Sequence, residues 1–156
     1  IVLLVLYLGF ISKFIDIDMK PKYNTNKTIY VKSSKNILNK SILLIPDNHY
    51  NTNSIQSLSN VSSKYSSGND CLYSISTLNT DIEDQILLNE FIKITGLNNN
   101  DLKLIKSYTL KKALPSKKTT LKEDKNIYFS GDWSAEPSID GAIKSGRICA
   151  EKLNDQ

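Results

Sequence analysis

The sequence is poor in the residues that build metal centres and disulfide frameworks. Its 156 residues include two cysteines and one histidine. Cys71 and Cys149 lie far apart with no second pair of ligands, so a zinc site has no support, and both are expected to be small buried residues. This cysteine usage fits a reducing, cytoplasmic compartment. His49 follows Pro46 and Asp47 and is expected in a solvated loop.

The chain also lacks an apolar run long enough to cross a bilayer as a helix. Residues 1–11 are almost wholly apolar, but a spanning helix needs about 20 such residues. The run has neither the basic start nor the small-residue cleavage pattern of a signal peptide. A buried strand, or the tail of a helix, is the favoured interpretation, and peripheral association with a membrane is the alternative. Because the first residue is Ile1, we expect a processed chain or a fragment.

A dense basic face is missing as well. The net charge is +4, and part of it comes from lysines between Lys111 and Lys125, where no aromatic residue is interleaved. A nucleic-acid site needs a denser basic surface, so this segment is expected to be a solvated loop and nucleic acid is excluded as a partner. Apolar residues make up 40% and charged residues 23% of the chain, which is ordinary for a globular domain with a core.

Short segments rich in β-branched and aromatic residues predict an antiparallel sheet. They are separated by polar turn residues, and such spacing leaves no room for the crossovers that parallel strands need. The predicted strands are residues 28–31, 41–45, 54–58, 71–78 and 102–110. A helix over residues 81–95 is predicted by Thr80 as N-cap, Glu83 completing a capping box, and Gly96 as the stop. Its apolar positions are Ile82, Ile86, Leu87, Phe91 and Ile94.

The C-terminal segment carries the chemistry. Residues 127–129 are a predicted buried strand that runs into a tight turn at Gly131 and Asp132. A helix is predicted to follow from Pro137 or Ser138. Ligands of open α/β sheets bind where strands end and helices begin, because exposed amides there favour electron-rich oxygens. A tightly packed strand–turn–helix unit without a ligand is the alternative explanation.

Apolar residues follow at intervals of three and four along this last helix, at Ile139, Ala142, Ile143, Gly146, Ala150 and Leu153. The helix also has many small residues, so it is expected to pack closely against a sheet or a ligand. These small residues are Gly141, Ala142, Gly146 and Ala150.

The order of residues in this segment resembles the C-terminal flavin-contacting motif of the flavin amine oxidase and phytoene desaturase superfamily. That motif has an aromatic strand, Gly-Asp, a Ser-hydrophobic-acid-Gly-Ala helix start, and Ser-Gly-Arg. The matching residues here are Gly131-Asp132, Ser138-Ile139-Asp140-Gly141-Ala142 and Ser145-Gly146-Arg147. Upstream, the strand order and Ala113-Leu114-Pro115 are similar to the phytoene desaturase branch. Ser63 and Ser66 stand where that branch commonly has prolines, so those loops are expected to differ.

The resemblance implies a fold of the α+β or α/β class. Residues 1–125 would be part of a substrate-binding domain, with an antiparallel sheet and a flanking helix. Residues 126–156 would be the last strand and helix of a Rossmann-like FAD-binding domain. The implied activity is that of an FAD-dependent oxidoreductase that dehydrogenates or isomerises a hydrophobic substrate, with a carotenoid-type desaturase favoured over an amine oxidase.

The resemblance also assigns cofactor-binding roles. Asp132 would hydrogen-bond the ribityl chain of FAD, and Gly131 would let the backbone approach it. The amide of Ile139, behind Ser138, would face the pyrimidine edge, and Ala142 would leave room for the ring. Trp133 either borders this site or is core packing, and no catalytic residue is assigned.

A G-x-G-x-x-G turn for the ADP half of FAD is absent from the sequence. The missing N-terminal dinucleotide-binding half is therefore an expected partner, and the chain is not expected to be active alone. The competing hypothesis is a truncated, non-enzymatic interaction domain derived from the same family. Arg147 and Glu151, one helical turn apart, are expected to be a surface pair.

Overall fold

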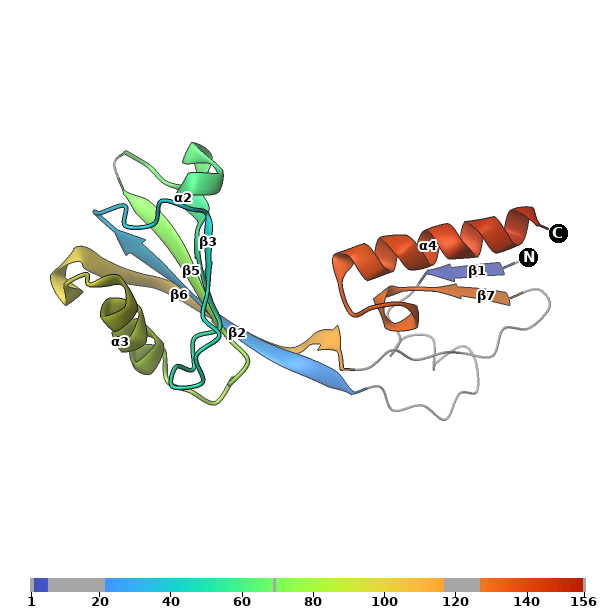
Figure 1. Ribbon diagram of the computed structural model, residues 1–156, viewed down its shortest axis with the longest axis horizontal. Helices are drawn as coiled ribbons and strands as arrows, with labels where there is room; N and C mark the ends of the chain where they lie inside the picture. The colour runs from blue at the N-terminus through green and yellow to red at the C-terminus, as the bar shows by residue number, and fades with distance from the viewer. Residues whose placement is uncertain (1, 6–21, 69, 117–126, 156) are drawn as a thin grey trace. The chain divides into compact units, whose positions relative to one another are not determined.

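The computed structural model describes residues 2–5, 22–68, 70–116 and 127–155. They belong to two compact units (Figure 1), each described by itself below. The sheet unit is Thr25–Lys111, and the strand–helix unit combines Ile1–Asn24 with Lys112–Gln156. This division differs from the predicted boundary after residue 125, because it groups the N-terminal residues with the C-terminal ones. Within the described ranges, no helix has both the length and the apolar character needed to span a membrane.

The sheet unit is built on the predicted antiparallel sheet. The strands are β2 (Tyr23–Ser33), β3 (Ile42–Leu44), β4 (Ser54–Ser57), β5 (Cys71–Thr77) and β6 (Leu102–Pro115). Their order in space is β3-β4-β5-β2-β6, and the pairs β2–β5, β4–β5 and β3–β4 are antiparallel. The fold class is therefore confirmed as a mixed α and β architecture.

One face of this sheet forms a hydrophobic core with helix α3 (Asp84–Thr95). Ile29, Ile55 and Ile75 lie in one row across β2, β4 and β5, and all three are fully buried. Leu87 and Phe91 from α3 are also fully buried in this core. Apolar residues alternate along the strands and recur at nearly every fourth position along α3. Both sets of side chains therefore point into one core between the sheet and the helix.

The predicted capping box at the start of α3 is wrong. The helix begins three residues later than expected, at Asp84, and its N-cap is Glu83, which makes no side-chain cap hydrogen bond. The Ile82 carbonyl accepts a hydrogen bond from the Lys27 ammonium group, and the Ile82 side chain is buried in the core. These contacts hold the preceding residues in a turn. Gly96 ends the helix in the left-handed conformation, with φ of 72°, as predicted.

The buried residues of α3 also differ in part from those predicted. Ile86, expected on the buried face, is 44% exposed, whereas Leu88 is buried beside Leu87 and Phe91. The other predicted members, Ile82 and Ile94, do contribute to the core.

Strand β6 is longer than the sequence suggested. Pro115, expected in a loop, is the last residue of the strand and is buried. The amide of Ser116 then donates to the carbonyl of Lys22 at 2.8 Å. A proline is tolerated here because β6 is an edge strand, where one side of the backbone needs no partner. Most of the predicted lysine-rich loop, residues 117–126, lies outside the described residues.

The strand–helix unit contains a parallel pair of strands followed by a helix. Strand β1 (Val2–Val5) pairs with β7 (Ile127–Ser130), with Val2 opposite Ile127 and Val5 opposite Ser130. Helix α4 (Ile139–Asn154) follows β7. The predicted strands at 1–11 and 127–129 are thus confirmed for the described residues, and residues 6–11 lie outside them.

Short helices complete the described chain. They are α2 (Leu58–Val61) and the 3-10 turns η1 (Ser63–Tyr65), η2 (Asn99–Asp101) and η3 (Asp132–Ser134). Cys71 and Cys149 are both buried, as expected. His49 lies in an exposed loop with its ring 92% accessible, and its backbone and ring both contact the Asp47 carboxylate. These hydrogen bonds lower the pKa of Asp47.

Candidate functional site

The predicted cofactor site is the turn between β7 and α4. Gly131 follows the last residue of β7, and Asp132 opens the 3-10 turn η3. The amide and the hydroxyl of Ser134 both donate to the Gly131 carbonyl, at 3.1 and 2.8 Å. The chain therefore folds back on itself directly after the strand, and the same segment holds all five predicted residues.

Ser138 is the N-cap of α4, which decides between the two predicted helix starts. Its side-chain oxygen accepts from the Gly141 amide at 2.9 Å, and its carbonyl accepts from the Ala142 amide at 3.0 Å. The amides of Ile139 and Asp140 have no acceptor in the part of the chain that the structure describes. They belong to the first turn of α4, which has no intrahelical acceptors to offer them. The helix start thus presents two hydrogen-bond donors.

The five predicted residues differ in how accessible they are. Ile139 is 83% exposed, while Gly131, Asp132, Ser138 and Ala142 are half-buried. The Asp132 carboxylate makes no hydrogen bond or ion pair within the described residues. The turn therefore offers an acceptor at Asp132, donors at the helix start, and an apolar side chain at Ile139.

Two glycines of the motif are required by packing inside the protein. A Cβ atom on Gly131 would lie 2.3 Å from the Trp133 indole nitrogen. A Cβ atom on Gly141 would lie 1.8 Å from the carbonyl oxygen of Glu136, where the backbone crosses the start of α4. The absence of a side chain at Gly131 thus makes room for a tryptophan of the same chain, which the sequence alone did not indicate.

Ser145 was part of the motif but had no predicted role. Its hydroxyl lies 2.8 Å from the hydroxyl of Ser130 and accepts from the Gly131 amide at 2.7 Å. Both serines are buried. Ser145 therefore fixes the end of β7 onto α4, and it positions the turn that carries Asp132.

The buried face of α4 agrees with the prediction at Gly141 and Cys149 but not at the larger apolar residues. Gly141, Ser145 and Cys149 are buried, whereas Ile139 and Ile143 are 83% and 68% exposed. The buried residues recur every four positions and are all small, because the helix lies close to β7 and η3. A stripe of Gly, Ser and Cys at this interval was the signal in the sequence, and the larger apolar residues concealed it.

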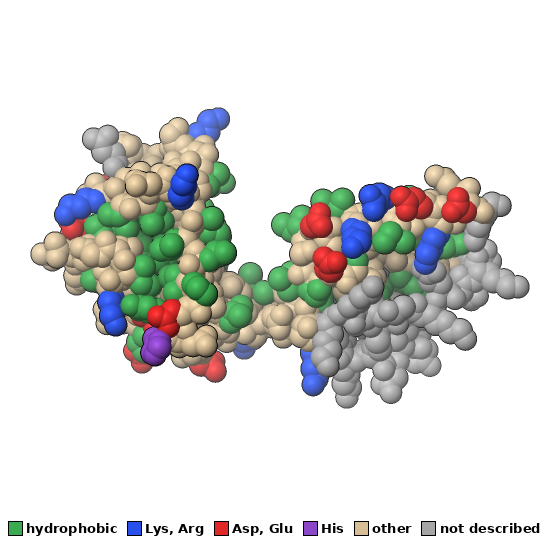
Figure 2. Space-filling model, viewed as in Figure 1, with side chains coloured by type: hydrophobic (Ala, Val, Ile, Leu, Met, Phe, Trp, Pro, Cys, Tyr) green, Lys and Arg blue, Asp and Glu red, His purple; other side chains and the backbone are tan. Residues whose placement is uncertain are grey.

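The exposed side of α4 carries charges of both signs, as Figure 2 shows. Arg147 lies 3.6 Å from Glu151, and both are well exposed, so the predicted surface pair is confirmed. Lys144 lies 3.4 Å from Glu136. Trp133 is 1% exposed and its ring meets Phe129 edge-on at 6.4 Å. Of its two predicted roles, core packing is therefore the one observed.

In the sheet unit, the face opposite α3 is a second surface of interest, here called the open face. Strand register places Ile42, Gln56, Ser74 and Tyr30 in one row on it, and Tyr108 meets Tyr30 edge-on at 5.9 Å. All five side chains are uncharged. The next row contains Leu44, Ser54, Ser76 and Thr28, which are also uncharged.

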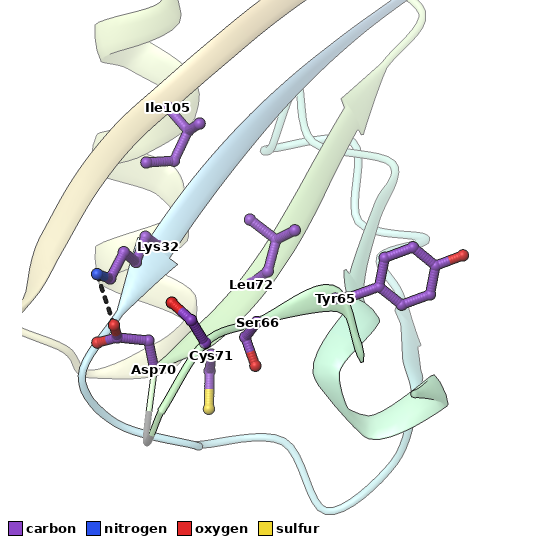
Figure 3. A pocket seen from close by; sticks show the side chains of 8 residues that line it. Lys32, Tyr65, Ser66, Asp70, Cys71, Leu72 and Ile105 are labelled. Atoms are coloured by element: carbon purple, nitrogen blue, oxygen red, sulfur yellow. Dashed lines mark ion pairs between the residues drawn. The ribbon is translucent and has the colours of Figure 1, made fainter. Parts of the chain in front are cut away.

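A pocket of about 250 Å³ lies in the sheet unit beside β2, β5 and β6 (Figure 3). Leu72 and Ile105 give it an apolar wall, and Lys32 pairs with Asp70 at 2.5 Å on its border. Tyr65 and Ser66, from the loop expected to differ from the phytoene desaturase branch, complete the lining with Ser67 and Cys71. An apolar wall beside a neutralised charge pair suits a weakly polar ligand.

Known proteins resemble this chain in structure but not detectably in sequence. No model of a protein family matches it, and no curated protein is matched. A crystal structure of a Pyrococcus furiosus protein is similar over 96% of the chain, with a TM-score of 0.64 and 12% identity. An oxidoreductase from Methanosarcina mazei is similar over 84%, with a TM-score of 0.60 and 11% identity.

These likenesses establish a shared fold. The chain spans 36% and 35% of the length of the two neighbours. One of the two neighbours, the M. mazei protein, is named an oxidoreductase.

Proposed function

We propose that this chain is the C-terminal portion of an FAD-dependent oxidoreductase of the phytoene desaturase-like branch of the amine oxidase superfamily. The observation that carries the proposal is the turn after β7. There the Asp132 carboxylate, which has no partner in the described residues, opens η3, and the next helix along the chain is α4, whose first amides lack acceptors. The oxidoreductase with a similar fold supports the general class of reaction.

The residues of the turn fit one edge of a flavin. The Asp132 carboxylate would accept hydrogen bonds from ribityl hydroxyls, and the amides of Ile139 and Asp140 would donate to the oxygens of the pyrimidine edge. Ala142 is small and half-buried, so it leaves space at the helix start. The sequence has no G-x-G-x-x-G turn to hold the pyrophosphate. The ADP half would be held by a dinucleotide-binding half outside this sequence.

When bound, FAD supplies the electron acceptor for dehydrogenating a C–N or C–C bond, or for a related isomerisation. The contribution of this chain is to hold and orient the cofactor and the substrate. Ser145 fixes the turn, and Ser138 fixes the start of α4. The open face of the sheet, with uncharged rows around Tyr30 and Tyr108, is the surface proposed for a hydrophobic substrate.

The test begins with the coding sequence on either side of this chain, where a dinucleotide-binding half is expected. In the full-length product, Asp132→Ala should weaken flavin retention about tenfold to a hundredfold, because it removes hydrogen bonds to a charged group worth about 1.5 to 3 kcal/mol. Glu151→Ala, which removes an exposed carboxylate from the same unit, is the matched control and should leave retention unchanged. The isolated chain should not retain FAD.

The competing proposal is a truncated interaction domain without enzymatic activity. It predicts that no dinucleotide-binding half is encoded nearby. If Asp132 has only a structural role, Asp132→Ala lowers the melting temperature equally with and without FAD and leaves the flavin dissociation constant unchanged. That result would refute the flavin assignment, even in a protein that proves to be a flavoenzyme.

A further inference from the structure

We propose that the β6 edge of the sheet unit docks onto an anionic lipid bilayer. The surface, here called the β6 edge, consists of apolar and basic side chains that alternate irregularly along the strand. They are Lys103, Leu104, Ile105, Lys106, Tyr108, Leu110 and Lys111. This proposal is independent of the flavin site, which lies in the other unit.

Charge in the sheet unit is concentrated on this strand. From Leu102 to Ser116 the chain contains four lysines and no acidic residue. Three of these lysines lie in the sheet unit, Thr25–Lys111, which otherwise has six lysines against seven acidic residues. The unit is therefore close to neutral apart from the β6 edge. A positive strand on a neutral body favours a planar negative partner.

The lysines of the β6 edge have no acidic partner in the described part of the chain. Lys27, Lys32 and Lys35 each form an ion pair with an aspartate, at 2.7, 2.5 and 2.8 Å. In contrast, Lys103, Lys106 and Lys111 form no ion pair with any described residue. Lys106 lies over the ring of Tyr108 on the same strand, 5.9 Å from its centroid, a contact that leaves its charge unneutralised. All three charges are therefore available to an anionic partner.

Apolar side chains on the same strand are also accessible. Leu104, Ile105, Tyr108 and Leu110 are 40%, 50%, 54% and 57% exposed. Because β6 ends the sheet, side chains of both faces border the same open edge. Tyr108 adds an aromatic ring with a hydroxyl, a side chain suited to the boundary between lipid and water.

A protective role for the lysines alone does not account for this surface. Lysines on an edge strand discourage pairing with a second sheet. That role explains Lys103, Lys106 and Lys111, but it favours polar residues between them rather than four exposed apolar ones. Basic and apolar groups together match a bilayer surface, which offers negative headgroups above hydrocarbon.

The experiment is co-sedimentation of the purified chain with two kinds of vesicle. One is pure phosphatidylcholine, and in the other about a third of the lipid is phosphatidylserine. Binding is expected only with phosphatidylserine and should weaken in high salt. The triple variant Lys103→Gln, Lys106→Gln, Lys111→Gln should lose about a hundredfold in affinity, since each lysine near the surface contributes about fivefold.

A matched control separates the β6 edge from net charge. Lys40→Gln, Lys64→Gln, Lys93→Gln removes the same charge from other parts of the sheet unit and should retain nearly all binding. The double variant Leu104→Ser, Leu110→Ser should lose about tenfold in vesicle affinity, because each leucine side chain is expected to bury about half of its surface in the bilayer. A spin label carried by the lipid should broaden the NMR signals of the Leu104 and Leu110 amides in the unaltered chain. This measurement does not depend on whether a variant folds.

Three results would overturn the proposal. The first is no sedimentation with phosphatidylserine vesicles at low salt. The second is an equal loss of binding in the two triple variants, which would make the attraction a property of net charge. The third is spin-label broadening at residues away from β6 with none at Leu104 or Leu110.

Discussion

The sheet unit and the strand–helix unit solve the problem of burial in different ways. In the sheet unit, large apolar residues from α3 and three strands are fully buried against one another. In the strand–helix unit, the residues of α4 that are buried are Gly141, Ser145 and Cys149, while Ile139 and Ile143 remain exposed. The first arrangement fills the space between a helix and a sheet with large side chains, and the second brings the end of β7 against Ser145 of α4. Substitutions in the two units should therefore have different consequences.

The largest effect is expected in the core of the sheet unit. Phe91 is fully buried and its ring lies 5.4 Å from that of Tyr73. Phe91→Ala should lower the free energy of unfolding by about 3 to 5 kcal/mol, the usual cost of an aromatic cavity. Ile143→Ala, in the exposed face of α4, should change it by less than about 0.5 kcal/mol. Urea denaturation of both variants measures the contrast, and similar losses would show that α4 also buries Ile143.

The next comparison uses two glycines of α4. Gly141→Ala places a Cβ against the Glu136 backbone, so it should destabilise the helix start by about 1 to 3 kcal/mol. At Gly146 the nearest atom to a new Cβ is the Ser130 hydroxyl oxygen at 3.7 Å, an ordinary contact. Gly146→Ala should be neutral or stabilise the helix by up to about 1 kcal/mol.

Hydrogen exchange of the α4 amides distinguishes these two variants. Faster exchange is expected for Gly141→Ala and unchanged or slower exchange for Gly146→Ala. If both variants behave alike, the close approach of residue 136 to the helix is not what requires a glycine.

A third prediction concerns Glu90, a carboxylate on α3 that holds the loop before β4. Its two oxygens accept from the amides and side chains of Asn51 and Thr52, at 2.7 to 3.0 Å. Partial burial by itself raises the pKa of Glu90, but these hydrogen bonds outweigh it and the pKa is lowered. The stability they contribute is therefore present above the unfolded-state pKa and is lost as pH falls through the lower, folded-state value.

Glu90→Gln should lower the free energy of unfolding by about 1 to 2 kcal/mol at neutral pH. The loss is at the low end for hydrogen bonds to a charged group, because the amide of the glutamine keeps one acceptor. It should also flatten the acid side of the stability profile. Melting curves between pH 3 and pH 7, roughly the range in which carboxylates titrate, measure both effects. A variant that keeps the acid slope of the unaltered protein would mean that other carboxylates produce it.

The smallest effect is expected at the surface of α4. Arg147 and Glu151 are 3.6 Å apart with side chains 70% and 63% exposed. Glu151→Gln should change the free energy of unfolding by less than about 0.5 kcal/mol, as for most exposed ion pairs. A larger loss of unfolding free energy, measured by thermal melts, would indicate that this side of α4 packs against another part of the protein.

Much of the sheet unit could be predicted from the sequence because burial there follows the local pattern. The alternation in β2 and β5 decides which face is apolar, and Gly96 ends α3 through its own conformation. The start of α3 could not be predicted in this way. Lys27, more than fifty residues earlier, binds the Ile82 carbonyl and displaces the capping box that Thr80 and Glu83 suggested.

At the candidate site, the sequence by itself determined the order of the elements, the strand, the turn with Asp132 and a helix start at Pro137 or Ser138. Only the tertiary structure decided which face of α4 is buried. Periodicity favours the larger apolar residues, but the short distance between α4 and β7 admits only small ones, so Gly141, Ser145 and Cys149 pack inward. The hydroxyl of Ser145 then binds the end of β7, a contact that depends on two segments meeting and that no local pattern encodes.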